Sequence, residues 1–221
     1  QCLDDFNIPL KLSTTIINIH GHDRLEGVTI AQVDANRKPI SGTEEYIACD
    51  TLLLSVGLLP ENELSRKANI VLNKVTGGPI VDESMQTSIP GIFTCGNVLH
   101  VHDLVDNVTT ESYTAGKNAA DCIKGIHQEG QSIEVIATDG VRYTVPSTIN
   151  PKNIGNSIDV RFRVGEVHKA AYISVYFDDV REMHLKKKIL TPGEMESVKL
   201  TKAVFEKYSD CKKITIKVEK E

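Results

Sequence analysis

The 221-residue sequence contains no long hydrophobic run. Its longest nearly uninterrupted apolar stretch, TLLLSVGLLP at residues 51–60, is far shorter than the roughly 20 residues of a membrane-spanning helix. The chain also does not open on a charged segment followed by an apolar one, which is the pattern of a secretory signal peptide. We therefore expect a protein without a membrane span.

Cysteine and glycine motifs are also missing. The five cysteines are scattered and odd in number, at Cys2, Cys49, Cys95, Cys122 and Cys211. Without a CxxC pair or a regular spacing, they argue against a disulfide framework or a zinc site and favour a reducing, cytoplasmic location. No GxGxxG turn, which grips the pyrophosphate of a dinucleotide, occurs in the chain.

Positive charge is scarce in the first part of the chain. Residues 1–128 carry 9 Lys and Arg against 16 Asp and Glu, a net charge of −7, whereas residues 129–221 carry 16 against 14, a net charge of +2. The total of −5 argues against a dedicated nucleic-acid-binding protein. The balance changes at the polar stretch 124–132, where we place a domain boundary.

The first part of the chain combines strand and helix patterns. Short strands are predicted at 14–21, 25–34, 44–57, 77–82 and 91–96. The continuous apolar run TLLLSV at the end of 44–57 is typical of a strand covered on both faces, as in a parallel sheet. A helix is predicted over 106–125, because small and apolar residues recur there at three- and four-residue spacing.

After residue 132 the period of the pattern changes to two. About seven short strand patterns follow with no convincing helix, and this predicts a small β-sandwich that folds on its own. Asp139 and Gly140 lie between the first two of these strand patterns and predict a hairpin turn.

The segment GIFTCGN at 91–97 predicts a strand that stops at Gly96 and Asn97 shortly before a helix. Such an end places free N–H groups and the positive end of a helix dipole together, a geometry that favours an anion or an electron-rich ring edge. Gly96 would let a ligand approach the backbone closely. The segment also mimics the spacing of a P-loop, but Asn97 and Val98 stand where Lys and Ser or Thr are needed, which excludes that interpretation.

Three segments in order, CDTLLLSVGLLPENEL at 49–64, VDESMQTSIPGIFTCGNV at 81–98 and TAGKNAA at 114–120, resemble the pyridine nucleotide-disulfide oxidoreductase family of two-dinucleotide flavoproteins. The resemblance covers residues 1–128. It implies FAD and NAD(P)H as cofactors. The fold class it implies is α/β plus all-β, a remnant of the two-dinucleotide-binding flavoprotein fold followed by the small β-sandwich.

The resemblance also implies a set of cofactor-binding residues. Gly57 would approach the nicotinamide side, and Gly96, Asn97 and Val98 belong to the motif that would meet the ribityl chain and pyrophosphate of FAD. The family usually has Asp where this chain has Asn97, and the change keeps an acceptor oxygen while removing a negative charge beside an anionic pyrophosphate.

Two threonines complete this set. Thr109 and Thr110, expected in the first turn of the helix that follows, would present backbone N–H groups to the flavin pyrimidine edge. The dipole of that helix would stabilise negative charge on the reduced flavin. No catalytic residue is assigned.

The expected domains are the tail of an NAD(P)H-binding domain at 1–55, the C-terminal part of an FAD-binding domain at 56–128, and the β-sandwich at 129–221. The expected function is the C-terminal part of an FAD-dependent NAD(P)H oxidoreductase that supplies half of the FAD site. We expect this chain alone to be inactive and to retain neither cofactor. Its main expected partner is the upstream FAD- and NAD(P)H-binding part of the same protein. A partner redox subunit and a homo-oligomer are further alternatives, and no nucleic-acid partner is expected.

Several alternatives remain open from the residues alone. The β-sandwich could instead be a non-catalytic module that binds a partner subunit. The pairs His20/His22 and His100/His102 could ligate a metal, although a metal site needs three or four ligands and loop or surface histidines are the ordinary interpretation. A flavin-adjacent role for His100 or His102 is favoured over metal binding. Cys95 is expected to be a small buried residue rather than a catalytic thiol.

Overall fold

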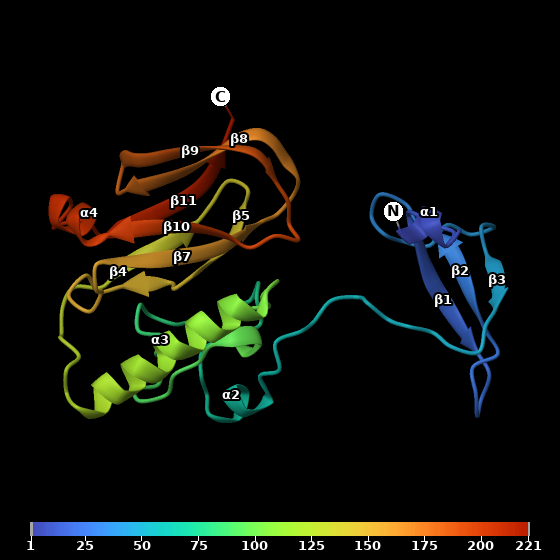
Figure 1. The fold of residues 1–221 in the computed structure, drawn as a ribbon, viewed down its shortest axis with the longest axis horizontal. Coiled ribbons are helices and arrows are strands. Elements are labelled where there is room, and N and C mark those ends of the chain that lie inside the picture. The colour runs from blue at the N-terminus through green and yellow to red at the C-terminus, as the bar shows by residue number, and fades with distance from the viewer. Residues whose placement is uncertain (1, 221) are drawn as a thin grey trace. The chain divides into compact units, whose positions relative to one another are not determined.

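The computed structural model describes residues 2–220 and divides into two compact units, Gln1–Gly57 and Leu58–Glu221 (Figure 1). The second unit runs across the boundary predicted at 128/129, and the three domain assignments stay predictions. None of the helices between residues 2 and 220 is long and apolar enough to cross a membrane. The five cysteines are all free thiols.

The first unit is a small antiparallel sheet. Its elements are the short helix α1 (Cys2–Asp5) and the strands β1 (Thr14–His20), β2 (Gly27–Gln32) and β3 (Glu45–Ala48), in the sheet order β1-β2-β3. The middle strand β2 buries Val28, Ile30 and Ala31. The strands predicted at 14–21 and 25–34 are thereby confirmed.

The strand predicted over 44–57 is wrong beyond Ala48. β3 ends there, and the following TLLLSV segment has no regular structure. Leu53, Leu54 and Val56 are 89%, 67% and 86% exposed. A strand of this composition is stable when neighbours cover both of its faces, and no strand within residues 2–220 pairs with this segment.

The second unit begins with turns and helices. They are α2 (Glu63–Lys67), the 3₁₀ turn η1 (Gly96–Val98) and α3 (Val105–Ile123), which confirms the long helix predicted near 106–125. The strands predicted at 77–82 and 91–96 are wrong, because these segments form only isolated bridges such as Val81–Thr87 and Gln86–Phe93. Here too, strand-like sequences lack the neighbours that would extend a ladder.

Eight strands and one helix follow α3. They are β4 (Ile133–Ala137), β5 (Val141–Val145), β6 (Thr148–Ile149), β7 (Ser157–Val164), β8 (His168–Phe177), β9 (Val180–Leu190), β10 (Glu196–Thr201), α4 (Lys202–Lys207) and β11 (Lys213–Glu219). They form a three-stranded sheet in the order β10-β7-β5 and a five-stranded sheet in the order β6-β4-β11-β8-β9. We call these residues, 133–219, the two-sheet unit.

One hydrophobic core lies between the two sheets. Val160, Phe162 and Val164 of β7 and Ile214 and Ile216 of β11 belong to the same buried cluster and are 0% exposed. Each such side chain contributes about 1.5–3 kcal/mol to stability by leaving water. Burial alternates along both strands, as the period of two predicted.

Two predictions for this region are wrong. Asp139 and Gly140 do form a turn, with φ of 41° and 90°, but β4 and β5 on either side of it belong to different sheets. The turn therefore passes the chain from one sheet to the other, and the long hairpin is β8–β9 instead. The region also contains a helix, α4, whose Phe205 is buried in the core and contacts Phe177 edge-to-face.

The three-stranded sheet also packs against α3 on its other face (Figure 1). A register shift in β5 between Val141 and Tyr143 turns the strand over, so that Val141 lies in the sheet core while Tyr143 and Val145 join a second cluster. That cluster also holds Val81, Met85, Leu99 and Ala115. Residues 58–128 and the two-sheet unit are thus packed together.

This packing gives a prediction about autonomy. A protein of residues 130–221 keeps its own core and should unfold cooperatively, but Tyr143 and Val145 become exposed. We expect its Tm to be lower than that of residues 58–221 by at least about 5 °C, measured by calorimetry. Equal Tm values, or a broad melt of the shorter protein, would contradict this.

Candidate functional site

The candidate site is the turn at Gly96 and the start of α3. Cys95 is extended, and Gly96 then adopts φ +69°, a left-handed conformation that favours glycine. A Cβ added to Gly96 would lie 3.1 Å from Val108 Cγ1 of α3, so the turn runs close against the helix. α3 starts after Leu104, which has no capping side chain, so its first N–H groups lack a side-chain cap within residues 2–220.

The structure brings most of the predicted cofactor residues into this one unit. Gly96, Asn97 and Val98 form η1, and Asn97 Oδ1 accepts a hydrogen bond from the His102 N–H at 3.1 Å. Val98 is 41% exposed. Gly57 belongs to the other unit, where it has φ +96° and open space around its α-carbon.

The placement predicted for the threonines needs correction. Because α3 begins at Val105, Thr109 and Thr110 lie in its second turn rather than its first. Their hydroxyls donate to Val105 O and Asp106 O, at 3.1 and 2.9 Å. The first N–H groups of α3 are therefore those of Val105 and Asp106, and cofactor binding by the two threonines stays a prediction.

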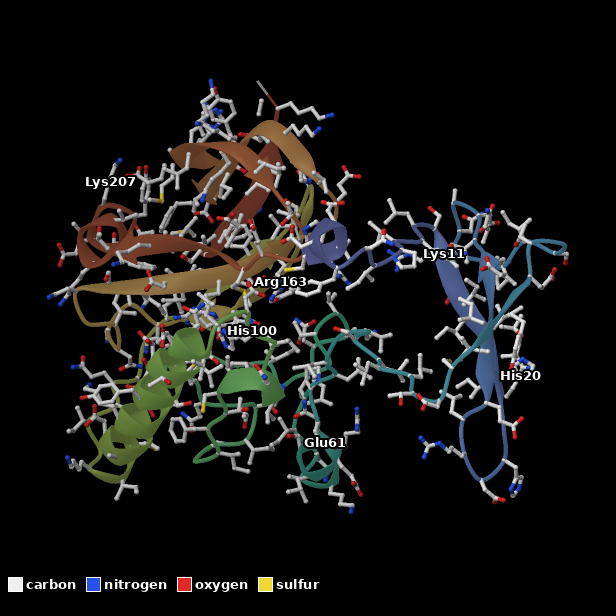
Figure 2. All side chains as sticks on the ribbon, turned by 45° about the vertical axis from the view of Figure 1, so that its right-hand side comes forward. Lys11, His20, Glu61, His100, Arg163 and Lys207 are labelled. Carbon is white, nitrogen blue, oxygen red and sulfur yellow. The ribbon has the colours of Figure 1, made fainter. Side chains whose placement is uncertain are left out.

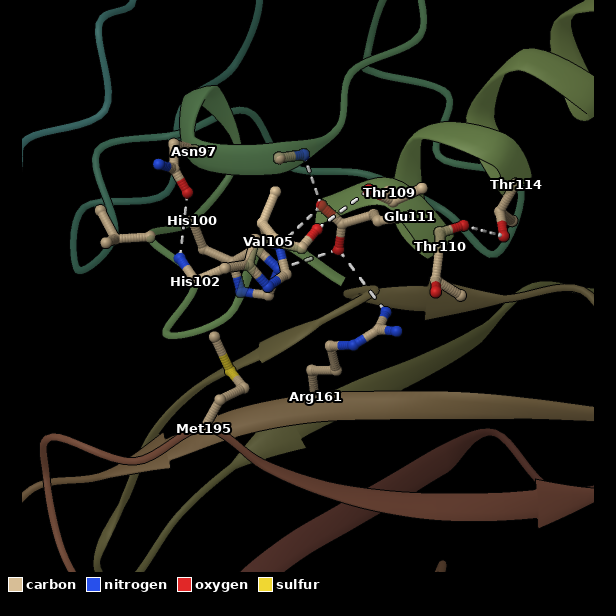
Figure 3. A network of polar contacts seen from close by, with 12 residues as sticks. Asn97, His100, His102, Val105, Thr109, Thr110, Glu111, Thr114, Arg161 and Met195 are labelled. Atoms are coloured by element: carbon tan, nitrogen blue, oxygen red, sulfur yellow. Dashed lines mark hydrogen bonds and ion pairs between the residues drawn. The ribbon is translucent and has the colours of Figure 1, made fainter. Parts of the chain in front are cut away.

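Behind the turn lies a buried carboxylate, Glu111 of α3, with a set of hydrogen-bond donors (Figure 3). Gly96 N–H donates to its Oε2 at 2.6 Å. His100 Nε2 and His102 Nε2 each lie 3.0 Å from one of its oxygens. Arg161 Nη1 of β7 lies 3.5 Å from Oε1. The Glu111 side chain is 0% exposed, so these contacts replace water around its charge.

The electrostatics follow from burial and donors. Burial raises the pKa of Glu111, but the hydrogen bonds from His100, His102 and the Gly96 N–H together outweigh it and lower the pKa to about 2. Burial lowers the pKa of His100, more than the neighbouring carboxylate raises it. The site is thus an ionised carboxylate that accepts Nε2–H from a neutral His100.

The side chains of His100, His102 and Glu111 could hold a metal ion, since their ligand atoms lie within 4.8 Å of one another. Two observations favour the hydrogen-bonded carboxylate instead. A divalent cation would lie beside the Arg161 guanidinium and would replace donors that the carboxylate already has. A metal-bound histidine normally donates its other ring N–H to an acceptor, and Nδ1 of His100 and of His102 is buried without a hydrogen-bond partner within residues 2–220.

The centre of this site was not predicted from the sequence. His100 and His102 lie in a loop, as the ordinary interpretation had it, but both side chains are buried rather than on the surface, and a flavin-adjacent role for either stays a prediction. Glu111 went unnoticed, although it lies between Val108 and Ala115 on the packing face of the predicted helix. A lone acid on such a face was the available signal. Cys95 is half-buried beside the second cluster, and its thiol contributes nothing to the carboxylate network.

Comparison with known proteins shows the family of this chain. Residues 1–120 match the sequence model of the pyridine nucleotide-disulphide oxidoreductase family, and this is more than half of the chain. The chain belongs to this family. The resemblance stated from three sequence segments is thereby confirmed, and the family and its relatives are oxidoreductases.

Individual relatives of this pyridine nucleotide-disulphide oxidoreductase chain match over limited lengths. Mitochondrial dihydrolipoyl dehydrogenase of Caenorhabditis elegans is 30% identical over 106 residues, 48% of this chain and 20% of that protein. Nitrite reductase [NAD(P)H] of Neurospora crassa is 40% identical over 53 residues, 24% of this chain and 4% of that protein. The chain thus matches a fifth or less of these relatives' lengths.

A solved structure, T. acidophilum thioredoxin reductase, aligns with a TM-score of 0.47 and 22% identity, over 57% of this chain and 39% of that one.

The buried Glu111 makes stability depend on pH. Its pKa is about 2 in the folded protein against 4.5 for a free carboxyl, so its contribution is present above pH 4.5 and is lost as pH falls towards 2. The lowered pKa of His100 acts in the same direction from about pH 6.5 downward. We expect urea unfolding between pH 7 and 3 to show that the parent protein loses more stability than Glu111→Gln, by an amount on the order of 2 kcal/mol.

The matched control is Glu206→Gln, an exposed acid in α4, which should follow the parent protein at every pH. An unchanged pH dependence in Glu111→Gln would show that the carboxylate is not ionised against these donors.

Proposed function

We propose that this chain supplies one half of the FAD site of an FAD-dependent NAD(P)H oxidoreductase. The observation that carries the proposal is the Gly96 turn, which Glu111 holds against α3, a helix whose start has no capping side chain. The other half of the site, a glycine-rich turn, would come from a part of the protein outside these 221 residues.

The residues present fit such a cofactor. The free N–H groups at the start of α3 suit an electron-rich edge, and the positive end of the helix dipole favours added negative charge by about 0.3–1 kcal/mol at an exposed site. The side chains at the start of α3 itself, Leu104 and Val105, are apolar and exposed by 63% and 74%. An apolar rim around backbone donors is suited to an aromatic ring.

When bound, FAD supplies the hydride chemistry between a nicotinamide and the final acceptor. The role of this chain is to bind and orient. Gly96 and Asn97 would hold the ribityl chain and pyrophosphate, and the N–H groups at the start of α3 would bind the ring edge. Gly57 would approach the nicotinamide side, as the family resemblance implies. We assign no acid–base step to any residue here.

We further propose that the two-sheet unit is a small β-sandwich, which the single core shared by both sheets supports. The alternative, a module that only binds a partner subunit, is not favoured, because the three-stranded sheet packs onto α3 of the same chain. A cytoplasmic location and a redox partner or second copy of the chain belong to the same proposal.

The turn can be tested in the whole flavoprotein. Gly96→Val places a branched side chain at φ +69° and against Val108, so FAD should be lost on purification. Gly91→Val is the matched control, since Gly91 also has a positive φ, +82°, but open space around it and no place in the site. Asn97→Asp should keep its flavin. A full complement of FAD in Gly96→Val would refute the placement of the site.

A second test uses the 221-residue chain itself. With half of the contacts, it should purify without FAD and without visible flavin absorbance. Exposed apolar residues of the TLLLSV segment should cause self-association, which light scattering measures. A yellow monomer with one FAD per chain would show that the Gly96 turn and α3 are sufficient, and that the proposed second half is not needed.

A further inference from the structure

We propose that the two-sheet unit acts as a brace: through Arg161 and Arg163 of β7 it positions the Gly96 turn. The inference rests on the proposed function, because it says which residues hold the turn that would meet FAD. Its basis is a set of contacts between β7 and the loop that joins Gly96 to α3, which we call the flavin loop (residues 96–104).

β7 is built with two different faces. Val160, Phe162 and Val164 point into the core between the sheets. The alternating residues Arg161 and Arg163 therefore point to the opposite side, where α3 and the flavin loop lie (Figures 2 and 3). Their side chains are only 13% and 14% exposed, so water has little access to either guanidinium.

Arg163 binds the flavin loop directly. Its Nη2 donates to Val101 O at 3.0 Å and to Asp103 Oδ1. Its Nη1 donates to two carbonyl oxygens of the turn before β10, those of Pro192 and Gly193. One guanidinium thus joins the flavin loop to this turn through four hydrogen bonds.

Asp103 closes the same clamp from the loop side. Its second oxygen, Oδ2, accepts the Met195 N–H at 2.7 Å, so the carboxylate bridges β7 and the segment that leads into β10. Charge-assisted bonds of this kind are about twice as strong as neutral ones, and the planar fork of Arg fixes their direction. The loop between His102 and α3 is therefore held in a fixed position relative to the three-stranded sheet.

Arg161 acts on the turn through Glu111. Its guanidinium lies 3.5 Å from the carboxylate that accepts the Gly96 N–H. The positive charge supports the ionised form of Glu111, and Glu111 in turn fixes Gly96 against α3. Both arginines are positioning residues, since neither lies in the turn itself.

The first experiment uses the 221-residue chain and measures amide hydrogen exchange of the flavin loop. Arg163→Gln removes the charged clamp, and we expect exchange at residues 96–104 to rise by about tenfold, with β11 unchanged. Arg181→Gln is the matched control, because Arg181 lies on β9 and pairs with Glu219 away from the loop. Asp103→Asn is a second variant that keeps the Arg163 bond to Val101 O.

The second experiment uses the whole flavoprotein and measures the Kd of FAD and the flavin reduction potential. We expect Arg163→Gln to raise the Kd about tenfold and to shift the potential, with Tm close to that of the parent. Arg163→Lys, which keeps the charge without the fork, should restore part of the affinity.

The outcomes separate the two proposals. Unchanged exchange in both Arg163→Gln and Asp103→Asn overturns the brace, whatever the Kd of FAD and the flavin reduction potential are. Faster exchange with an unchanged Kd and potential also overturns it, because the loop would then not position FAD. If the parent protein binds no FAD at all, the proposed function fails, while the exchange data still report on the clamp.

Discussion

A buried negative charge at Glu111 is the constraint on which the second unit depends. An ionised carboxylate without water is costly unless donors surround it, and here they come from the Gly96 turn, the two loop histidines and β7. Because Arg161 is far from the other donors in the sequence, the carboxylate has all of its donors only when the turn, α3 and the three-stranded sheet have packed. The same packing holds Gly96 against α3, and this arrangement is the half-site that we propose for the cofactor.

The same requirement explains why residues 58–128 and the two-sheet unit are packed together in the second unit. The register shift in β5 directs Tyr143 and Val145 towards α3, and the two arginines of β7 face the same way. The three-stranded sheet therefore serves two cores, one between the sheets and one against the helix. A sheet that is covered on both faces is a rigid base for a loop, which is what a preformed binding turn needs.

The first unit shows what happens when such neighbours are missing. β1, β2 and β3 form by local antiparallel pairing, and their patterns were predictable. The TLLLSV segment has an even stronger strand composition but stays irregular and exposed, because a parallel strand takes its stability from layers on both sides. The same reason accounts for GIFTCG, where the turn at Gly96 was predictable and the strand before it does not form.

The sequence by itself determined the family, the glycine turn before a long helix, and the two-residue alternation of β7 and β11, because each is a local pattern or a short motif. Tertiary structure alone decided the strand pairing, the passage of the Asp139–Gly140 turn between sheets, and the partners of Glu111. Arg163 and Asp103 are 60 residues apart, and no local pattern links them. Their contact depends on the distance between β7 and α3. Only the packing of the two hydrophobic clusters, one between the sheets and one against α3, sets that distance.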